Sequence, residues 1–408
     1  MKNQKRNILL SVGSRAISRI GDVMFDFANN TFLTGLGTRS VFFVGTYQAT
    51  ETIIGILFNI FGGAIADNFK RKKIIIYTDF LSGIACILAS FIYKKVWLAY
   101  AIIIVNIFLA IMDSFSSPAY KAYTKEIVKI NRISRLNSYL ETSSTIVKVT
   151  IPAVSVFLYG LLKIQGTLLL DGCSFIISTI LLYFTQPLTK DYGTEKFKDK
   201  FELNKIFRDI FEGMRYLVNN KRILSIVILS AWVNFFLAAY NLLLPYSNKA
   251  FHASSINLYA MFLVSEALGG LIGAILSGFL NKKLSINRLI IFLGLSGLSL
   301  LLLPIIYVLF NNSVLLNAFP FSFNLFLTIF NVQFFSIVQR EVDNEYIGRV
   351  FGIIFTVALL FMPIGTAVFS ITLNVSNSFN FVFIGGSIIV LALFFKIFNH
   401  FLKLTSLN

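Results

Sequence analysis

The chain has 408 residues, of which 56% are hydrophobic and only 13% are charged, and its mean hydropathy is +0.76. Soluble domains carry about 25% charged residues, so this composition excludes an ordinary soluble protein and indicates a polytopic membrane protein. The net charge of +17 is also typical of nucleic-acid-binding proteins, and only the positions of the cations separate the two explanations.

Twelve windows of roughly 20 apolar residues, each long enough to cross a ~30 Å hydrocarbon core as a helix, follow one another along the chain. Short connections, such as the one at Lys94 and Lys95, predict antiparallel neighbours. The predicted fold class is therefore all-α and integral to the membrane. The predicted spans are 9–35, 41–65, 74–93, 96–117, 136–160, 164–186, 223–245, 256–280, 288–309, 313–336, 347–372 and 378–402.

The cations are distributed unevenly between the connections. If both termini lie in the cytoplasm, only five of the 36 Lys and Arg residues fall in external connections, namely Arg39, Lys94, Lys95, Lys163 and Lys249. This asymmetry follows the positive-inside rule and, with anionic lipid headgroups, accounts for the basic excess without a nucleic-acid partner. We expect a multi-pass protein of the plasma membrane with both termini in the cytoplasm.

The longest polar stretch runs from Lys190 to Arg222 and is the only candidate linker. Apolar residues recur in it at helical spacing among Lys and Glu, which predicts an amphipathic helix on the inner membrane surface; a solvated tether is the alternative. We therefore expect an amino-terminal bundle at 1–189, a cytoplasmic middle loop at 190–222 and a carboxy-terminal bundle at 223–408.

The two predicted bundles repeat each other. Glu51, Gly55 and Gly63 recur 215 residues later as Glu266, Gly270 and Gly278. The constant offset indicates a duplicated six-helix unit, an arrangement used by transporters that bind substrate near the midplane between the two repeats.

The connection from Gly62 to Lys73 resembles the loop between helices 2 and 3 of the major facilitator superfamily. The matching residues are Gly63, Ile65, Ala66, Asp67, Arg71 and Lys72, whereas Asn68 and Lys70 differ from the pattern. Gly21-Asp22, Ser117-Pro118-Ala119 and Gly348 to Gly352 are similar to the macrolide-efflux and enterobactin-exporter branch of that superfamily. The resemblance implies the major facilitator fold, with twelve transmembrane helices in two six-helix bundles, and secondary transport.

The same loop suggests an inner gate. In the family that the chain resembles, the acid at Asp67 caps helix 11, which begins here near Ile347. Arg71 is placed to pair with Asp113 near the inner end of the fourth span, and Gly62 and Gly63 allow the helices to approach closely. The candidate gate residues are Gly63, Asp67, Arg71, Asp113, Gly348 and Arg349.

Four charged residues of the first span, Arg15, Arg19, Asp22 and Asp26, are spaced by four, three and four positions and share one helical stripe. An ionised side chain at mid-bilayer costs about 2.5–3.5 kcal/mol, so we expect the stripe to face the protein interior, with Arg19 and Asp22 as an internal pair. The stripe is either a buried ion network that fixes helix packing or a proton-responsive wall of a cavity.

Glu51, Lys148 and Glu266 also fall near the middle of their predicted spans. Desolvation favours the neutral form of a carboxyl group, so an isolated Glu51 would hold a proton and release it when the cavity opens to water. A permanent ion pair with Lys148 or Arg19 is the alternative. Because Glu266 is the sole acid within the predicted spans of the second half, we expect ion coupling in the first half.

The second half offers aromatic and amide groups that suit a bulky amphipathic ligand. The candidate substrate-cavity residues are Trp232, Asn234, Phe235, Asn241, Asn324 and Asn331. Cys86 and Cys173 lie within apolar runs, and we expect buried thiols without a metal or disulfide role.

No motif indicates an enzyme, a cofactor or a metal site, and the sequence has no phosphate-binding Gly loop. The leading hypothesis is a monomeric secondary transporter that exports an amphipathic organic molecule, such as a macrolide, by alternating access driven by the proton gradient. The alternatives are export of a siderophore or other endogenous metabolite, a lysophospholipid flippase and, from another class, a non-transporting membrane sensor.

Overall fold

The computed structural model describes residues 2–188, 212, 214–253, 257–280, 286–342 and 347–405. This part is almost entirely α-helical and contains no strand, which confirms the predicted fold class. It separates into two compact units, Met1–Lys200 and Phe201–Asn408, divided inside the predicted middle loop. Most of that loop, and with it the predicted amphipathic helix, lies outside the described residues, although residues 214–219 at its end are helical.

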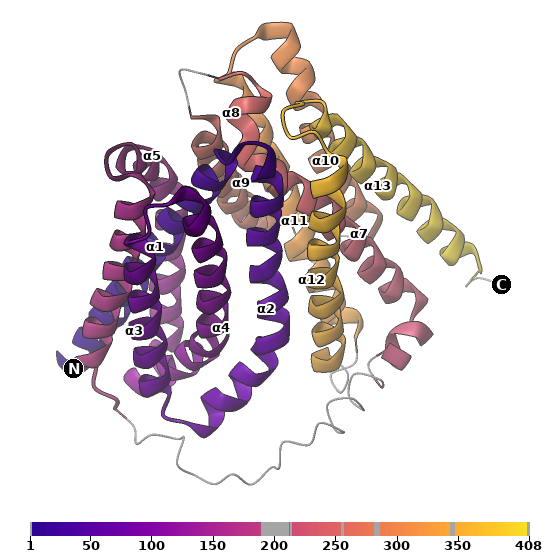
Figure 1. The fold of residues 1–408 in the computed structure, drawn as a ribbon. Coiled ribbons are helices and arrows are strands. Elements are labelled where there is room, and N and C mark those ends of the chain that lie inside the picture. Colours follow the sequence, from indigo (N-terminus) through magenta and orange to yellow (C-terminus); the bar gives the residue numbers. More distant parts are fainter. Residues whose placement is uncertain are drawn as a thin grey trace. The chain divides into compact units, whose positions relative to one another are not determined.

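The first unit is a bundle of long helices (Figure 1). Apolar runs of this length fold as helices because a helix satisfies its own backbone hydrogen bonds where no water is available. The runs end at short polar connections, such as Phe69 and Lys70, whose extended backbone separates two helices. The helices are α1 (Lys2–Thr34), α2 (Ser40–Asn68), α3 (Arg71–Ser90), α4 (Lys95–Ile127) and α5 (Ile130–Tyr183).

The helix α5 contains both the fifth and the sixth predicted spans. Its 54 residues are interrupted at Lys163, which has a left-handed backbone conformation with φ 56° and ψ −168°. Leu136 before the break and Leu182 after it lie in the same buried cluster, beside Tyr123 of α4. The helix therefore doubles back at Lys163, as the two predicted spans require.

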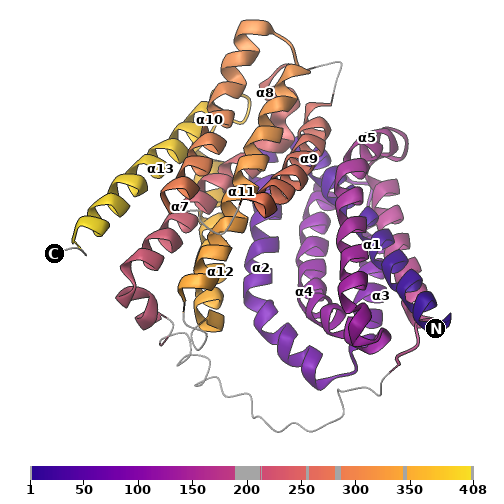
Figure 2. The same ribbon diagram turned by 180° about the vertical axis from the view of Figure 1, so that it is seen from behind.

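The second unit is also a bundle of long helices, seen from behind in Figure 2. Short helices at Leu244–Tyr246, Ser247–Ala250 and Leu315–Asn317 form connections within it. The long helices are α7 (Lys221–Leu243), α9 (Leu258–Phe279), α10 (Ile286–Phe310), α11 (Ala318–Glu341), α12 (Ile347–Thr372) and α13 (Asn380–Thr405).

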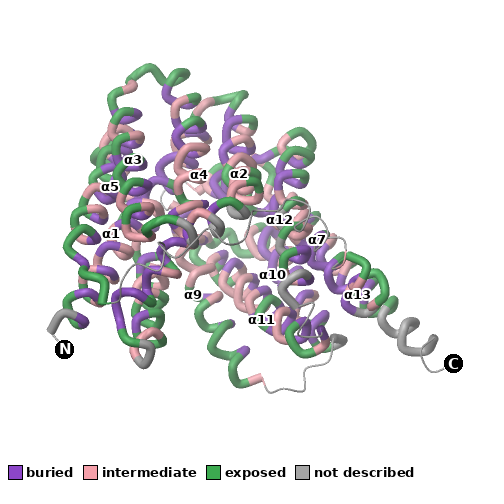
Figure 3. Tube along the Cα trace, turned by 90° about the horizontal axis from the view of Figure 1, so that it is seen from below, coloured by how far each residue is buried: buried purple, intermediate pink, exposed green. Residues whose placement is uncertain are grey.

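Ten helices within the described residues are long and apolar enough to cross a membrane. Helix α1 is not among them, because charged residues interrupt its apolar sequence, and α5 counts once although it doubles back. The long helices match the predicted spans in position, and the count of twelve crossings stays a prediction. Buried and exposed residues alternate along the same helices, as expected for helices that pack on one side (Figure 3).

Each unit contains a close contact between two glycines on neighbouring helices, and the two contacts are equivalent. A Cβ atom on Gly83 of α3 would lie 2.9 Å from the carbonyl oxygen of Gly172 on α5, and one on Gly172 would lie 2.8 Å from that of Gly83. In the second unit Gly297 of α10 and Gly385 of α13 approach each other in the same reciprocal way. The two pairs are 214 and 213 residues apart in sequence, so the predicted duplication is visible in the packing of the helices.

Candidate functional site

The first unit encloses a cavity of about 230 Å³. Helices α1 to α4 form most of its wall, and Phe175 of α5 contributes one side. Seven ionisable side chains line it, five of them acids: Arg15, Arg19, Asp22, Asp26, Glu51, Asp79 and Asp113. The polar neutral residues of the wall are Ser18, Thr78, Ser82, Asn106, Ser114 and Ser116. This is an unusually charged lining for an apolar bundle.

The charged stripe of α1 faces this cavity, which confirms its predicted inward orientation. The predicted internal pair is also present, with Arg19 Nη1 3.4 Å from Asp22 Oδ2. The Arg15 guanidinium lies over the ring of Tyr120, 5.2 Å from its centroid, where the aromatic face attracts the cation. The helical spacing of the stripe was therefore a sufficient signal for the position of these side chains.

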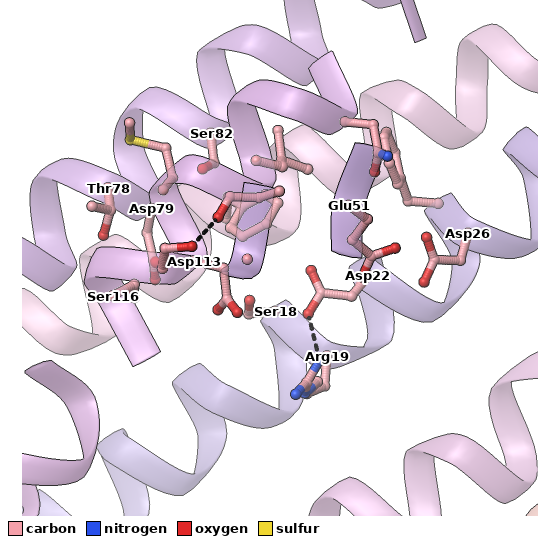
Figure 4. Close-up of a pocket in the computed structure, with 18 of the residues that line it drawn as sticks. Ser18, Arg19, Asp22, Asp26, Glu51, Thr78, Asp79, Ser82, Asp113 and Ser116 are labelled. Carbon is pink, nitrogen blue, oxygen red and sulfur yellow. Dashed lines mark hydrogen bonds and ion pairs between the residues drawn. The ribbon is translucent and has the colours of Figure 1, made fainter. Parts of the chain in front are cut away.

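Glu51 of α2 and Asp113 of α4 bring further carboxyl groups to the same cavity. Figure 4 shows the carboxyl groups of Asp22, Asp26 and Glu51 turned toward one another, with Arg19 beside Asp22. Lys148, predicted as a cavity charge or a partner of Glu51, is exposed on α5 and does not line this cavity. The Arg19 guanidinium reaches Asp22 instead.

The five acids of the cavity differ in their partners. Asp26 accepts a hydrogen bond of 2.6 Å from the hydroxyl of Tyr47, and Asp79 accepts one of 2.8 Å from Ser178. Asp22 has Arg19, whereas Glu51 and Asp113 form no hydrogen bond or ion pair with any described residue. Glu51 and Asp113 are therefore the carboxyl groups most available to water, protons or a cationic ligand.

Sequence reasoning did not assign Asp79, Tyr47 or Asn106 to the site. Asp79 lies on a buried polar stripe of α3 that also contains Thr78, Ser82 and Cys86, and this spacing of three to four residues was a signal available in the sequence. Asn106 joins α4 to α2 by donating its amide to the carbonyl oxygen of Tyr47 at 2.8 Å. Nothing in the sequence identifies that main-chain partner.

The predicted ion pair between Arg71 and Asp113 is wrong. Arg71 Nη1 lies 2.9 Å from Glu126 Oε1, whose side chain is 1% exposed, and Arg71 Nε donates to the carbonyl oxygen of Ala66 at 3.1 Å. Helix α4 continues ten residues beyond the predicted end of its span, through Pro118 to Ile127, and this extension brings Glu126 to Arg71. Asp113, more than three turns earlier, faces the cavity.

Gly62 and Lys72, at the two ends of the predicted gate loop, contact neighbouring helices. The close approach expected at Gly62 is confirmed, because a Cβ there would clash with the carbonyl oxygen of Ser114 on α4. Lys72 donates to the carbonyl oxygens of Tyr183 and Thr185, each at 2.8 Å, and so ties α3 to the end of α5. The surroundings of Gly63, Asp67, Gly348 and Arg349 lie outside the described part of the structure.

In the second unit, Glu266 and Asn324 come together. The hydroxyl of Tyr240 on α7 donates to Glu266 Oε1, and the Asn324 amide of α11 donates to the carbonyl oxygen of Glu266 at 2.8 Å. These contacts join three helices around the acid.

The remaining candidate substrate residues do not gather around that acid. Trp232 and Phe235 of α7 pack on Phe361 and Phe369 of α12, with ring centroids 5.7 and 4.9 Å apart. Asn234 bonds its own helix at Ser230, whereas Asn241 and Asn331 are exposed. The two aromatic residues therefore contribute to helix packing within the unit, and their place in a substrate cavity stays a prediction.

The cysteines differ from each other in burial. Cys86 is buried, as predicted, but Cys173 is exposed because it lies on the face of α5 opposite the buried Asp171 and Ser174. Both thiols are free. No cluster of three or more His, Cys, Asp or Glu residues suitable for a metal ion occurs among the residues that the structure describes.

Comparison with known proteins agrees with this architecture. The chain is 26% identical over 373 residues to macrolide efflux protein A of Streptococcus pyogenes, covering 86% of this chain and 87% of that protein. It is 26% identical over 331 residues to macrolide efflux protein A of Enterococcus faecalis, covering 77% and 97%. The POT family transporter PepTSo has the same fold, with a TM-score of 0.70 at 14% identity over 98% of both chains.

A family model supplies the classification. The model described as Major Facilitator Superfamily matches residues 14–366, which include the cavity of the first unit and most of the second. A multi-pass helical membrane protein with this match is a transporter rather than an enzyme. The chain therefore belongs to the major facilitator superfamily and is similar to its macrolide-efflux proteins.

Proposed function

We propose that this transporter exports an amphipathic organic molecule, of which a macrolide is the first candidate, in exchange for protons. The observation that carries this proposal is the acid-rich cavity of the first unit, where Glu51 and Asp113 form no hydrogen bond or ion pair with a described residue. Ionisable groups are costly inside a membrane protein and are kept mainly where they pair or line a path for ions. The names of the similar efflux proteins suggest the class of substrate.

The size of the cavity supports a role in coupling. Sites for drug-sized ligands usually measure about 300–1,000 Å³, more than the about 230 Å³ found here. A space of this size holds water and protons more readily than a whole macrolide. Glu51 and Asp113 would take up protons from one side of the membrane and release them on the other, with the proton gradient as the energy source and no bound cofactor.

The charge distribution suggests the orientation of the chain in the membrane, and the similar bacterial proteins suggest which membrane it is. We infer a monomer in a bacterial plasma membrane with both termini in the cytoplasm, where the many cations of the inner connections meet anionic lipid headgroups. Transport then proceeds by alternating access of a substrate site to the two sides of the membrane.

Efflux measurements test the function directly. Cells that express the protein should accumulate less radiolabelled erythromycin than cells without it, and an uncoupler should abolish the difference. A panel with a siderophore and a lysophospholipid should show no comparable export. Equal erythromycin accumulation with and without the protein would reject the macrolide, and export that survives the uncoupler would reject proton coupling.

A further inference from the structure

A carboxyl group outside the cavity is fully enclosed by three helix segments. Asp171, on the part of α5 that follows the break at Lys163, is 0% exposed. Its Oδ2 accepts a hydrogen bond from the thiol of Cys86 on α3 at 3.3 Å. Its Oδ1 is buried and has no hydrogen-bond partner among the residues that the structure describes. The neighbouring Ser174 hydroxyl donates to the main-chain carbonyl of Asp171 at 2.7 Å.

The unpartnered oxygen lies against the main chain of α1. A Cβ atom on Gly21 would clash with Asp171 Oδ1 and with the Ser174 hydroxyl. Only glycine at this position lets α1 approach α5 so closely. The backbone of Gly21 therefore covers the carboxyl group.

The charges around Asp171 do not stabilise a carboxylate. The charged groups that act on it are Asp22 and Asp26 of α1, which are acids themselves, and the titratable group from α3 is the Cys86 thiol, a weak donor. No Lys or Arg among the described residues forms an ion pair with it. An ionised carboxylate buried without a cation is strongly unfavourable, so the neutral acid is the form that fits this enclosure.

The enclosed Asp171 does not line the cavity, but it lies close to residues that do. Asp22, which follows Gly21 on α1, lines the cavity, and so does Phe175, about one helical turn after Asp171 on α5. A displacement of α1 from α5 at Gly21 thus opens Oδ1 to the cavity.

We propose that Asp171 is a second proton-binding site of the transporter, closed in the present conformation by Gly21 and opened to the charged cavity when α1 moves. The inference rests on the proposed proton coupling and adds a site to it. On opening, the O–H bond of the neutral Asp171 breaks and the proton passes to the Asp22 carboxylate or to a cavity water. The Asp171 carboxylate that remains keeps its hydrogen bond from Cys86, and reprotonation from the cavity restores the neutral acid.

Infrared difference spectroscopy of the purified full-length protein tests the protonation state without any substrate. A neutral carboxyl group has a C=O stretching band separate from those of carboxylates and amides. At pH 7.5 the spectrum of the wild type minus that of Asp171→Asn should contain one such band. Its absence would mean that Asp171 is ionised and would overturn the assignment. Cys86→Ala is the second variant, useful where Asp171→Asn does not fold, because it should shift the same band without removing it.

Hydrogen–deuterium exchange of that band tests whether the site opens. In D2O the band should shift within seconds, because large conformational transitions of proteins take microseconds to seconds. A band that stays unexchanged for hours would identify a permanent structural acid and overturn the role in proton transfer. Neither measurement depends on erythromycin, so failure of the efflux assay and failure of this assignment are distinguishable.

Discussion

The two units are built on the same scaffold but differ in the chemistry of their interiors. Reciprocal glycine contacts join α3 to α5 in the first unit and α10 to α13 in the second. In both, an asparagine amide donates to a main-chain carbonyl of the second helix of the repeat, from Asn106 to Tyr47 and from Asn324 to Glu266. The two units therefore share packing contacts, whereas the ionisable residues of the cavity belong to the first unit.

A phenol–carboxyl pair occurs in each unit with its members exchanged. In the first unit the acid Asp26 is on α1 and Tyr47 on α2, and in the second Tyr240 is on α7 and the acid Glu266 on α9. In the second unit this pair leaves Glu266 satisfied, whereas in the first Glu51, at the equivalent repeat position, stays open to the cavity. We therefore expect the proposed ion coupling at Glu51 rather than at Glu266.

The largest expected loss of stability comes from breaking the buried ion pair between Arg71 and Glu126 in the first unit. Arg71→Ala removes the cation paired with Glu126, a side chain that is 1% exposed, and should lower the free energy of unfolding by about 3–5 kcal/mol. Glu341 lies 215 residues after Glu126 and so takes the equivalent position in the repeat, but it is partly exposed. Glu341→Ala should therefore lower the free energy of unfolding by less. Unfolding of the purified variants by SDS titration in mixed micelles measures both. Equal losses would contradict the asymmetry between the units.

Neutral replacements of the equivalent acids Glu51 and Glu266 should affect efflux differently in the two units. Glu51→Gln should reduce uncoupler-sensitive efflux about tenfold or more, and Asp22→Asn should do the same, with normal expression. Glu266→Gln should stay within about threefold of the wild type, which corresponds to less than about 0.7 kcal/mol. Efflux rates under an imposed pH gradient check this. Full export by the first two variants, or a larger loss in the third, would move coupling to another site.

The shared scaffold predicts matched effects in the two units. Gly172→Val and Gly385→Val each force a side chain into a helix contact that has no space for it, and each should cost about 1–3 kcal/mol. Gly386→Val, next to the second contact but with open space around it, is the control. SDS unfolding should place the two contact variants within about 1 kcal/mol of each other. If Gly385→Val leaves the free energy of unfolding unchanged, the helices of the second unit pack differently from those of the first.

The smallest effects are expected at the phenol–carboxyl pairs. Tyr47→Phe and Tyr240→Phe each remove one hydrogen bond to an acid, at a cost of about 0.5–1.5 kcal/mol in stability. Tyr47→Phe should also change the pH dependence of efflux, because Asp26 lines the charged cavity, whereas Tyr240→Phe should leave it unchanged. Identical pH profiles for both variants would remove this distinction.

Periodicity and apolar length were enough to predict the helices and the inward orientation of the α1 stripe. The spacing of Arg19 and Asp22 also predicted their pair, because residues three apart on a helix are neighbours. The partner of Arg71 was missed because hydropathy marks where the apolar run stops, and α4 continues past that point to Glu126. Asp171 looked like any other acid within a span, since its enclosure depends on Gly21 of α1 and Cys86 of α3, which are distant in sequence.

The break at Lys163 has a mechanical consequence. A single residue reverses α5, so its two segments are joined without a loop that can absorb movement, and they behave as one stiff hairpin. The first helix has a longer tether, because Gly35 to Arg39 connect α1 to α2 and include Gly37 with φ +70°. If the contact at Gly21 opens as proposed, we therefore expect α1 to move and the two segments of α5 to stay in place.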